Sequence, residues 1–145
     1  MRAFILPLFI LTFNFSFSQE WKTNLEEAQQ LAQQQNKNII LVFSGSDWCA
    51  PCIKLDKNIW QSEVFKKEAE KKWILLRADF PKKKANQLSA ELAQSNKQLA
   101  EKYNPNGNFP LVVVLNPLGK VKGMLGYENV LPQEYIDLIH SLENK

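Results

Sequence analysis

Three largely apolar runs divide the chain, and segments with helical periodicity lie around them. The runs are residues 39–43, 73–80 and 111–115. Continuous apolar runs of this length are typical of strands that are buried on both faces of a sheet. They predict three central strands in a chain of the α/β class.

The helical segments begin with recognisable capping or turn residues. Thr23 and Glu26 have the spacing of a capping box, and Pro132 suits the first position of a helix. We expect helices to begin near Thr23, Ala50, Ser62, Leu88, Ser95 and Pro132. The first two strands, joined by helix, then form a βαβ unit with parallel strands and a right-handed crossover.

A fourth strand follows the third across a tight turn. Residues 116–119 place proline at the second turn position and glycine at the fourth. Residues 120–127 then return as a strand that we expect to be antiparallel to the third. The complete order predicts a three-layer α/β/α sandwich around a mixed, four-stranded sheet, with a short fifth strand possible.

The first 18 residues have the layout of a secretory signal peptide. Arg2 supplies a positive charge ahead of an almost wholly apolar run. Ser16 and Ser18 then place small residues just before the expected cleavage site, which precedes Gln19. The apolar run is shorter than the ~20 residues of a membrane-spanning helix. We therefore expect residues 1–18 to be removed during export and residues 19–145 to form one domain.

The charge balance gives no reason to expect a nucleic-acid partner. The formal net charge of the chain is only +3, whereas nucleic-acid-binding proteins carry a pronounced basic surface. The dense basic groups are Lys66–Lys67 and Lys82–Lys84. We interpret both groups as solvated helix faces.

The two cysteines of the chain, Cys49 and Cys52, follow the first central strand with the spacing C-x-x-C. At the start of a helix they lie near the partial positive charge of the helix N-terminus, which favours the reactive thiolate. A disulfide that encloses so few residues constrains the unfolded chain little and is a poor structural staple. The pair therefore indicates redox chemistry first and a metal site second.

The metal alternative is Cu(I). Two sulfurs are too few for a closed zinc site, which takes four ligands, whereas two thiolates can hold soft Cu(I). His140, the sole histidine, lies on the last helix, and we expect it to be a surface or interfacial residue rather than a catalytic base. A Cu(I)-binding metallochaperone is therefore an alternative, while our leading expectation includes no metal.

The motif and its context resemble the thioredoxin superfamily over roughly residues 20–143. The matching residues are Trp48, Cys49, Pro51 and Cys52 of the active-site motif, Phe109 and Pro110 of the cis-proline position, and Gly126 of the last strand. The resemblance implies a thioredoxin-like fold, in agreement with the order of elements.

The resemblance also implies a dithiol–disulfide cycle. Cys49 is expected to be the exposed nucleophile, and Cys52 the more buried resolving thiol. Trp48 is expected to pack beside the motif, and Phe109 with a cis Pro110 to shape the groove that binds substrate. Since the dithiol is itself the redox group, no organic cofactor is implied.

Pro51 and Asp47 are expected to support the cysteine pair. The Ala-Pro dipeptide lacks the histidine of strongly oxidising relatives, which favours a reductase. Such a protein would act on protein disulfides as a monomer, with electrons from a membrane thiol–disulfide transporter. Together with the signal peptide, this predicts the periplasm of a Gram-negative bacterium. Oxidation or isomerisation of disulfides, and a non-catalytic peptide-binding chaperone module, are the open alternatives.

One departure from the family concerns the proton of the resolving thiol. Thioredoxins carry a buried acid late in the first central strand, whereas residues 42–44 here are Val, Phe and Ser. Asp47 is the nearest acid, and it lies in the following loop. Water is then the expected acceptor for the proton of Cys52.

Overall fold

A five-stranded mixed sheet forms the centre of the structure, a computed structural model that describes residues 19–144. Its strands are β1 (Trp21–Lys22), β2 (Asn38–Ser44), β3 (Trp73–Asp79), β4 (Leu111–Leu115) and β5 (Val121–Leu125). They lie in the order β1-β3-β2-β4-β5. Strands β1 and β2 run parallel to β3, while β4 is antiparallel to both β2 and β5. The predicted mixed sheet is confirmed, and β1 is its short fifth strand.

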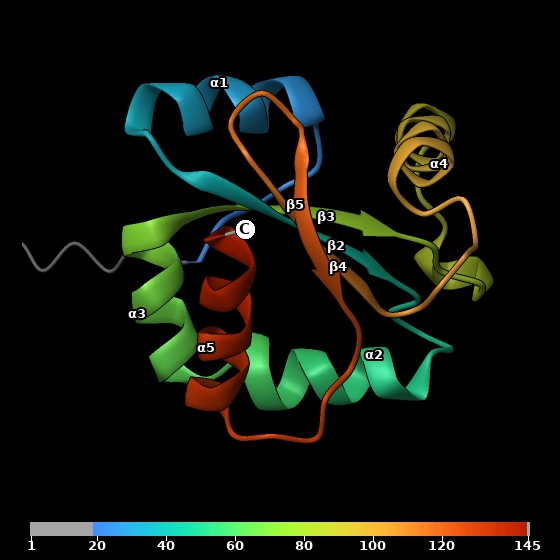
Figure 1. Ribbon diagram of the computed structural model, residues 1–145. Coiled ribbons are helices and arrows are strands. Elements are labelled where there is room, and N and C mark those ends of the chain that lie inside the picture. The colour runs from blue at the N-terminus through green and yellow to red at the C-terminus, as the bar shows by residue number, and fades with distance from the viewer. Residues whose placement is uncertain (1–18, 145) are drawn as a thin grey trace, which may run out of the picture.

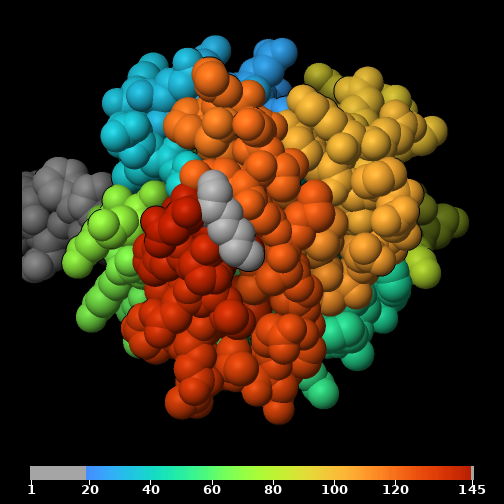
Figure 2. Space-filling view, viewed as in Figure 1, coloured from blue at the N-terminus to red at the C-terminus, as the bar shows by residue number. Residues whose placement is uncertain are grey.

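Helices cover both faces of the sheet (Figure 1). The helical elements are α1 (Leu25–Gln35), α2 (Ala50–Leu55), the π-helical turn η1 (Asp56–Trp60), α3 (Glu63–Lys72), the 3₁₀ turn η2 (Lys84–Asn86), α4 (Ala90–Tyr103) and α5 (Pro132–Glu143). Helices α1 and α4 pack on one face, and α2, η1, α3 and α5 pack on the other. Helix α5 (red) and the chain that leads into it from β5 (orange) lie at the centre of the face seen in Figure 2. The three-layer sandwich is therefore confirmed.

Two separate cores lie on either side of the sheet because successive strand residues point in opposite directions. Ile40 and Val42 of β2 join the core under α2, η1, α3 and α5, whereas Leu41 and Phe43 join the core under α1 and α4. All four side chains are at most 1% exposed. This is the pattern that the continuous apolar run predicted.

Two predicted helix starts are wrong. Helix α1 is capped by Asn24 rather than Thr23, because the Asn24 side chain accepts the bond from the Glu27 N–H. Helix α4 runs unbroken from its cap at Ser89 through the predicted start at Ser95. It continues there because Asn96 is buried and donates from Nδ2 to the carbonyl of Asp79 on β3, at 2.9 Å.

The helix expected over residues 50–59 is α-helical only as far as Leu55 and then becomes π-helical. After α2 the chain continues as η1, in which Gln61 N–H donates to the carbonyl of Asp56, five residues back. The wider turn keeps both Ile59 and Trp60 in the core, at 1% and 2% exposure. In a regular α-helix two adjacent side chains point about 100° apart. The π-helical turn η1 therefore helps both side chains to pack in the same core.

The predicted signal peptide, residues 1–18, lies outside the described residues. No helix between residues 19 and 144 is both long enough and apolar enough to cross a membrane.

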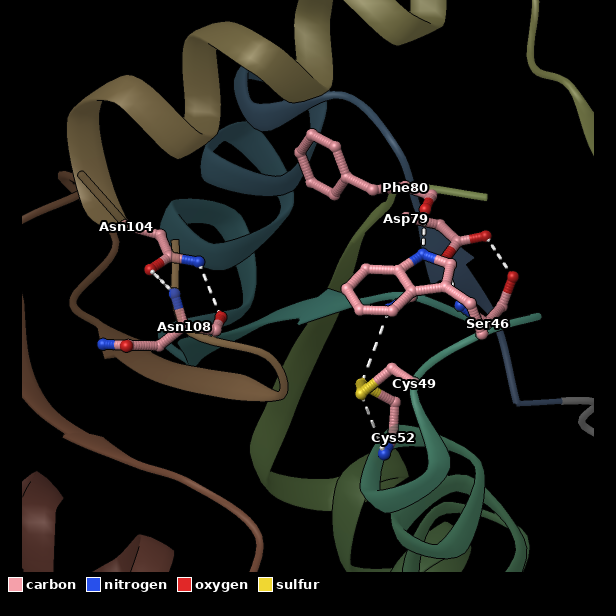
Figure 3. The surroundings of a disulfide bond; sticks show 9 residues. Ser46, Cys49, Cys52, Asp79, Phe80, Asn104 and Asn108 are labelled. Carbon is pink, nitrogen blue, oxygen red and sulfur yellow. Dashed lines mark hydrogen bonds between the residues drawn. A yellow bond between two sulfur atoms is a disulfide. The ribbon is translucent and has the colours of Figure 1, made fainter. Parts of the chain in front are cut away.

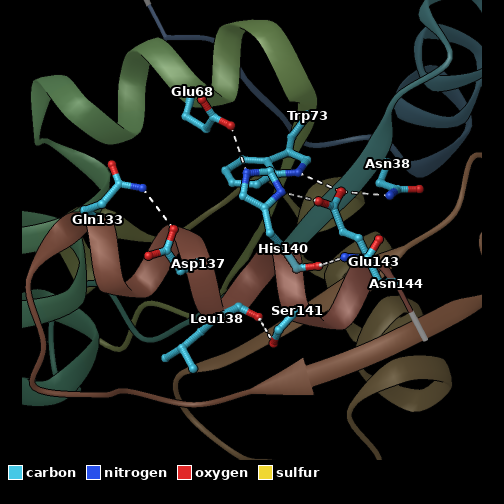
Figure 4. A network of polar contacts seen from close by, with 10 residues as sticks. All are labelled: Asn38, Glu68, Trp73, Gln133, Asp137, Leu138, His140, Ser141, Glu143 and Asn144. Atoms are coloured by element: carbon cyan, nitrogen blue, oxygen red, sulfur yellow. Dashed lines mark hydrogen bonds and ion pairs between the residues drawn. The ribbon is translucent and has the colours of Figure 1, made fainter.

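A polar clamp joins α3 and α5 on one face of the sheet (Figure 4). The His140 ring lies between two carboxylates, with Nε2 2.8 Å from Glu68 and Nδ1 2.6 Å from Glu143. The other Glu143 oxygen accepts from the Trp73 indole N–H at 2.9 Å and from the Asn38 amide at 2.8 Å. His140 is therefore an interfacial residue far from the cysteines, as predicted.

The two glutamates also set the charge of the histidine. Burial lowers the pKa of His140, but the hydrogen bonds and negative charges of Glu68 and Glu143 together raise it, and the net pKa lies above the ordinary 6.5. Once it is protonated, the His140 ring forms ion pairs with both carboxylates and links α3 to α5.

Replacing the ring by His140→Gln should destabilise the fold in a pH-dependent way. Because the folded-state pKa is raised, the ion pairs stabilise fully below about pH 6.5 and are lost as the pH rises through the folded-state value. Thermal melting at pH 6 should show a loss of up to about 1 kcal/mol, or about 4 °C in Tm. At pH 9 the loss should be smaller. Lys97→Gln on α4 is the charge control, and an equal loss at both pH values would contradict the clamp.

Candidate active site

The cysteines lie at the start of α2, directly after the loop that follows β2. Cys49 is the N-cap residue of this helix, and its Sγ accepts a hydrogen bond from the Cys52 N–H at 3.3 Å. Pro51 lies in the first helical turn, where a missing N–H leaves no partner unsatisfied. Cys49 and Cys52 are joined as a disulfide. The local sequence thus forms both the helix start and the redox pair.

Both cysteines of the disulfide, which Figure 3 shows at the start of α2, are buried. Cys49 is 5% exposed and Cys52 is 3% exposed, so the expectation of an exposed Cys49 is wrong for this form. The bond holds both side chains in the first turn of α2, where Cys52 Sγ also accepts from the Gly45 N–H at 3.5 Å. Backbone N–H groups therefore point at both sulfurs, and such groups stabilise negative charge.

Trp48 is held by contacts on several sides of its ring. Its indole N–H donates to the carbonyl of Phe80 at 2.7 Å, and its ring meets Phe109 edge-to-face at 5.5 Å between centroids. A Cβ at position 45 would lie 2.4 Å from the Trp48 ring, so only Gly45 leaves room for it. The Nζ of Lys82 lies 3.8 Å from the ring centroid. Trp48 is still 39% exposed and presents a rigid aromatic surface beside the disulfide.

The segment before β4 contributes the second wall of the site. The peptide bond between Phe109 and Pro110 is cis, as the resemblance implied. The Phe109 ring packs against both Trp48 and Phe80. The structure therefore brings together Trp48 and Phe109, two of the residues predicted to bind substrate. Pro110 is buried. Its carbonyl lies 3.8 Å from the Cβ position of Gly126, which follows β5 rather than lying within it.

An asparagine pair that the sequence did not single out shapes this segment. The buried Asn104 donates from Nδ2 to the carbonyl of Asn108 at 2.8 Å and accepts from the Asn108 N–H at 2.9 Å (Figure 3). This closed turn delivers Phe109 toward Trp48. The only local signal for it is the run Asn104 to Gly107, which predicts a chain break but not its partner.

Asp47 binds the backbone of a distant loop rather than the cysteines. Its two carboxylate oxygens accept from the N–H groups of Lys82 and Lys83, each at 2.9 Å, and from the Asn86 amide at 3.0 Å. The Lys82 hydrogen bond, followed by that of Asn86, holds the pKa of Asp47 below its ordinary 3.8. The contact is therefore strongest above that value and is lost as the pH falls through the lowered one.

A second carboxylate ties the same loops together. Asp79, at the end of β3, accepts from both the N–H and the hydroxyl of Ser46 (Figure 3). Residues 45–48 and 79–86 thus form one hydrogen-bonded unit beside the disulfide. Lys82 and Lys83 therefore lie in a loop next to Trp48, and the interpretation as a solvated helix face is wrong. Pro81, which ends β3, was the signal for a loop here.

No acid takes the place of the thioredoxin carboxylate late in β2. The strand ends at Ser44, and the preceding Phe43 is fully buried in the core under α1 and α4. Among residues 19–144, no carboxylate is hydrogen-bonded to Cys49 or Cys52. No group of three or more potential His, Cys, Asp or Glu ligands lies together in this described part of the chain.

The comparisons with known proteins agree with this geometry. A family model described as thioredoxin-like matches residues 20–117. The chain is similar to the disulfide bond reductase DsbH of Chlamydia pneumoniae, with 34% identity over 122 residues, or 84% of this chain and 71% of DsbH. The thioredoxin-related protein DsbJ of Chlamydia pneumoniae is 27% identical over 66% of this chain and 27% of its own length. A solved structure of a DsbH oxidoreductase has a TM-score of 0.79 at 30% identity and covers 95% of this chain and 94% of its own.

The Asp47 contacts predict the behaviour of the loop that it holds. Asp47→Asn replaces one carboxylate oxygen by an NH₂ group that cannot accept, so at least one backbone N–H of the loop loses its partner. Limited trypsin digestion at pH 7 should then cleave after residues 82–84 several-fold faster, since cleavage follows local opening. Cleavage after Lys71 in α3 provides the internal control. Unchanged cleavage after residues 82–84 would show that Asp47 does not hold this loop.

Proposed function

The chain belongs to the thioredoxin-like family of thiol–disulfide oxidoreductases, and we propose that it works outside the cytoplasm as a reductase of protein disulfides. The observation that carries this proposal is the Cys49–Cys52 disulfide in the first turn of α2, with the Cys52 N–H directed at Cys49 Sγ. An N–H at that position stabilises a thiolate more than a thiol. Cys49 is then the attacking sulfur.

The proposed cycle begins with the reduced pair. The Cys49 thiolate attacks one sulfur of a client disulfide, the client S–S bond breaks, and the released client sulfur takes up a proton. Cys52 then loses its proton and attacks Cys49, which breaks the mixed disulfide and frees the second client sulfur. Two electrons pass from the protein to the client, and the Cys49–Cys52 disulfide forms.

The neighbouring residues take supporting roles in this proposal. Trp48, Phe109 and Pro110 bind the client backbone, because they form the fixed wall beside the disulfide. Pro51 preorganises the helix start, and Asp47 supports the adjoining loop. Since no described carboxylate contacts Cys52, its proton leaves to water.

The direction of the cycle rests on the dipeptide between the cysteines. Ala50-Pro51 contains no histidine that could stabilise the thiolate further, and a less stabilised thiolate makes a stronger reductant. The similarity to a protein named a disulfide bond reductase supports the same direction.

The remaining parts of the proposal concern the cellular setting. Export through residues 1–18 would place the protein in the periplasm of a Gram-negative bacterium, and an N-terminus at Gln19 in the mature protein would test this. A reductase there needs electrons, for which we propose a membrane thiol–disulfide transporter. The dithiol requires no organic cofactor, and the protein would act as a monomer on protein disulfides.

The reduction potential of the Cys49–Cys52 pair tests the proposed direction. Residues 19–145 are equilibrated with a glutathione series, and Trp48 fluorescence monitors the fraction of protein that is oxidised. The reduction potential should be near −250 mV or below, close to the approximately −270 mV of thioredoxin. The same glutathione series with a Cys49→Ser variant controls for fluorescence changes that are unrelated to the disulfide. A value of about −180 to −120 mV would favour an oxidase or isomerase instead.

Single cysteine variants test the assigned roles. Cys52→Ser should accumulate a mixed disulfide between Cys49 and a client, because the resolving thiol is gone, and Cys49→Ser should accumulate none. Non-reducing electrophoresis with a disulfide-bonded test protein measures both. Full exchange activity in Cys49→Ser would contradict the nucleophile assignment. Client binding that survives loss of both cysteines without any exchange would favour the chaperone alternative, and stoichiometric copper retained through dialysis would favour the metallochaperone.

A further inference from the structure

A cavity and a cationic loop lie together beside Trp48, the residue that precedes Cys49. The cavity has a volume of about 290 Å³ and is lined by Asp79, Phe80, Pro81, Gln87, Leu88 and Ala93. Most of these residues lie on the segment between β3 and α4, and Ala93 lies in the first turn of α4. Phe80 connects the cavity to the site, since its carbonyl accepts from Trp48 and its ring packs on Phe109.

The loop beside this cavity is preorganised. Asp47 holds the N–H groups of Lys82 and Lys83, and Asp79 holds Ser46 on the facing loop. The 3₁₀ turn η2 closes the loop at its far end. A surface that is already ordered loses less conformational entropy when a partner binds. The loop therefore meets one requirement of a recognition surface.

The lysine side chains of the loop are available to an external anion. Lys82, Lys83 and Lys84 are exposed, and none of them takes part in a salt bridge among residues 19–144. Asp47 and Asp79 accept hydrogen bonds from the two loops, and the charge of Lys83 also acts on Asp47 without a direct ion pair. Lys82 also lies over the Trp48 ring at 3.8 Å, which brings a positive charge to the edge of the active site.

We propose that this surface docks an extended segment of the client protein that carries an acidic residue and an apolar side chain near its disulfide. The acidic residue pairs with the Lys82–Lys84 group, and the apolar side chain enters the cavity beside Phe80 and Leu88. Charge complementarity selects this occupant, because three lysines without a salt bridge in the described part of the chain directly follow Phe80 and Pro81 of the cavity lining. The inference rests on the proposed function and adds to it the class of client that reacts fastest.

The test compares two synthetic peptide disulfides that differ only in residues next to cysteine. One carries Asp and Leu, and the other carries Asn and Leu. The reduced protein should reduce the Asp peptide about tenfold faster at low ionic strength, as expected for electrostatic attraction at a charged surface. The preference should weaken in 0.5 M salt, where charges are screened within about 4 Å.

Matched triple variants show whether the loop causes the preference. Replacement of Lys82, Lys83 and Lys84 by Gln should abolish the difference between the two peptides. The same replacement of Lys67, Lys71 and Lys72, which are exposed on α3, should preserve it. Leu88→Gln should reduce the advantage of a Leu peptide over its Ala counterpart. Equal rates for both peptides in the unmodified protein, or a preference that survives the first triple variant, would overturn the proposal.

A binding measurement separates this inference from the proposed function. A Cys49→Ser, Cys52→Ser variant cannot exchange disulfides, so fluorescence anisotropy of a labelled Asp peptide with Ser in place of Cys reports docking alone. Binding that depends on the Lys82–Lys84 group, together with no reduction by the unmodified protein, would support docking and overturn the reductase. Reduction of both peptides at equal rates without such binding would support the reductase and overturn the docking proposal.

Discussion

The burial of β2 on both faces is the constraint on which the site depends. Its residues from Ile39 to Phe43 are at most 1% exposed and are shared between two cores. Strands β3 and β4 pair with β2 on either side, so the strand cannot slip without breaking two ladders. Its end at Ser44 is therefore fixed. Since β3 is parallel and Asp79 is paired with Ser44, both strands deliver their following loops to one edge of the sheet.

The polar groups at that edge divide into two sets with different tasks. The carboxylates of Asp47 and Asp79 hold loop backbone and Ser46, and neither is hydrogen-bonded to sulfur. The sulfurs instead accept from the backbone N–H groups of Cys52 and Gly45. The last residues of β2, Val42, Phe43 and Ser44, include no carboxylate. Charge stabilisation at the cysteines thus comes from backbone N–H groups of the helix start and the preceding loop rather than from side chains.

Trp48 connects the chemistry to recognition. It precedes Cys49 in the chain, and its ring contacts the cis-proline segment through Phe109 and the cationic loop through Lys82. Gly45 leaves room for the ring, because a Cβ at that position would lie 2.4 Å from it. A client segment on the Lys82–Lys84 group would therefore lie beside the same rigid ring that borders the disulfide. In this arrangement the selection of a client and the attack on its disulfide take place on one continuous surface.

The amino-acid sequence by itself determined the four strands β2 to β5, the helix starts at Ser62 and Pro132, and the redox motif, because apolar runs, turn and capping residues and C-x-x-C are local patterns. Ser95 has the same capping chemistry as Ser89, and only the packing of Asn96 on Asp79 decided that α4 continues. The tertiary structure alone also decided that Asp47 holds the lysine loop. Such contacts join residues far apart in the chain, so they depend on strand register and packing, which local patterns do not encode.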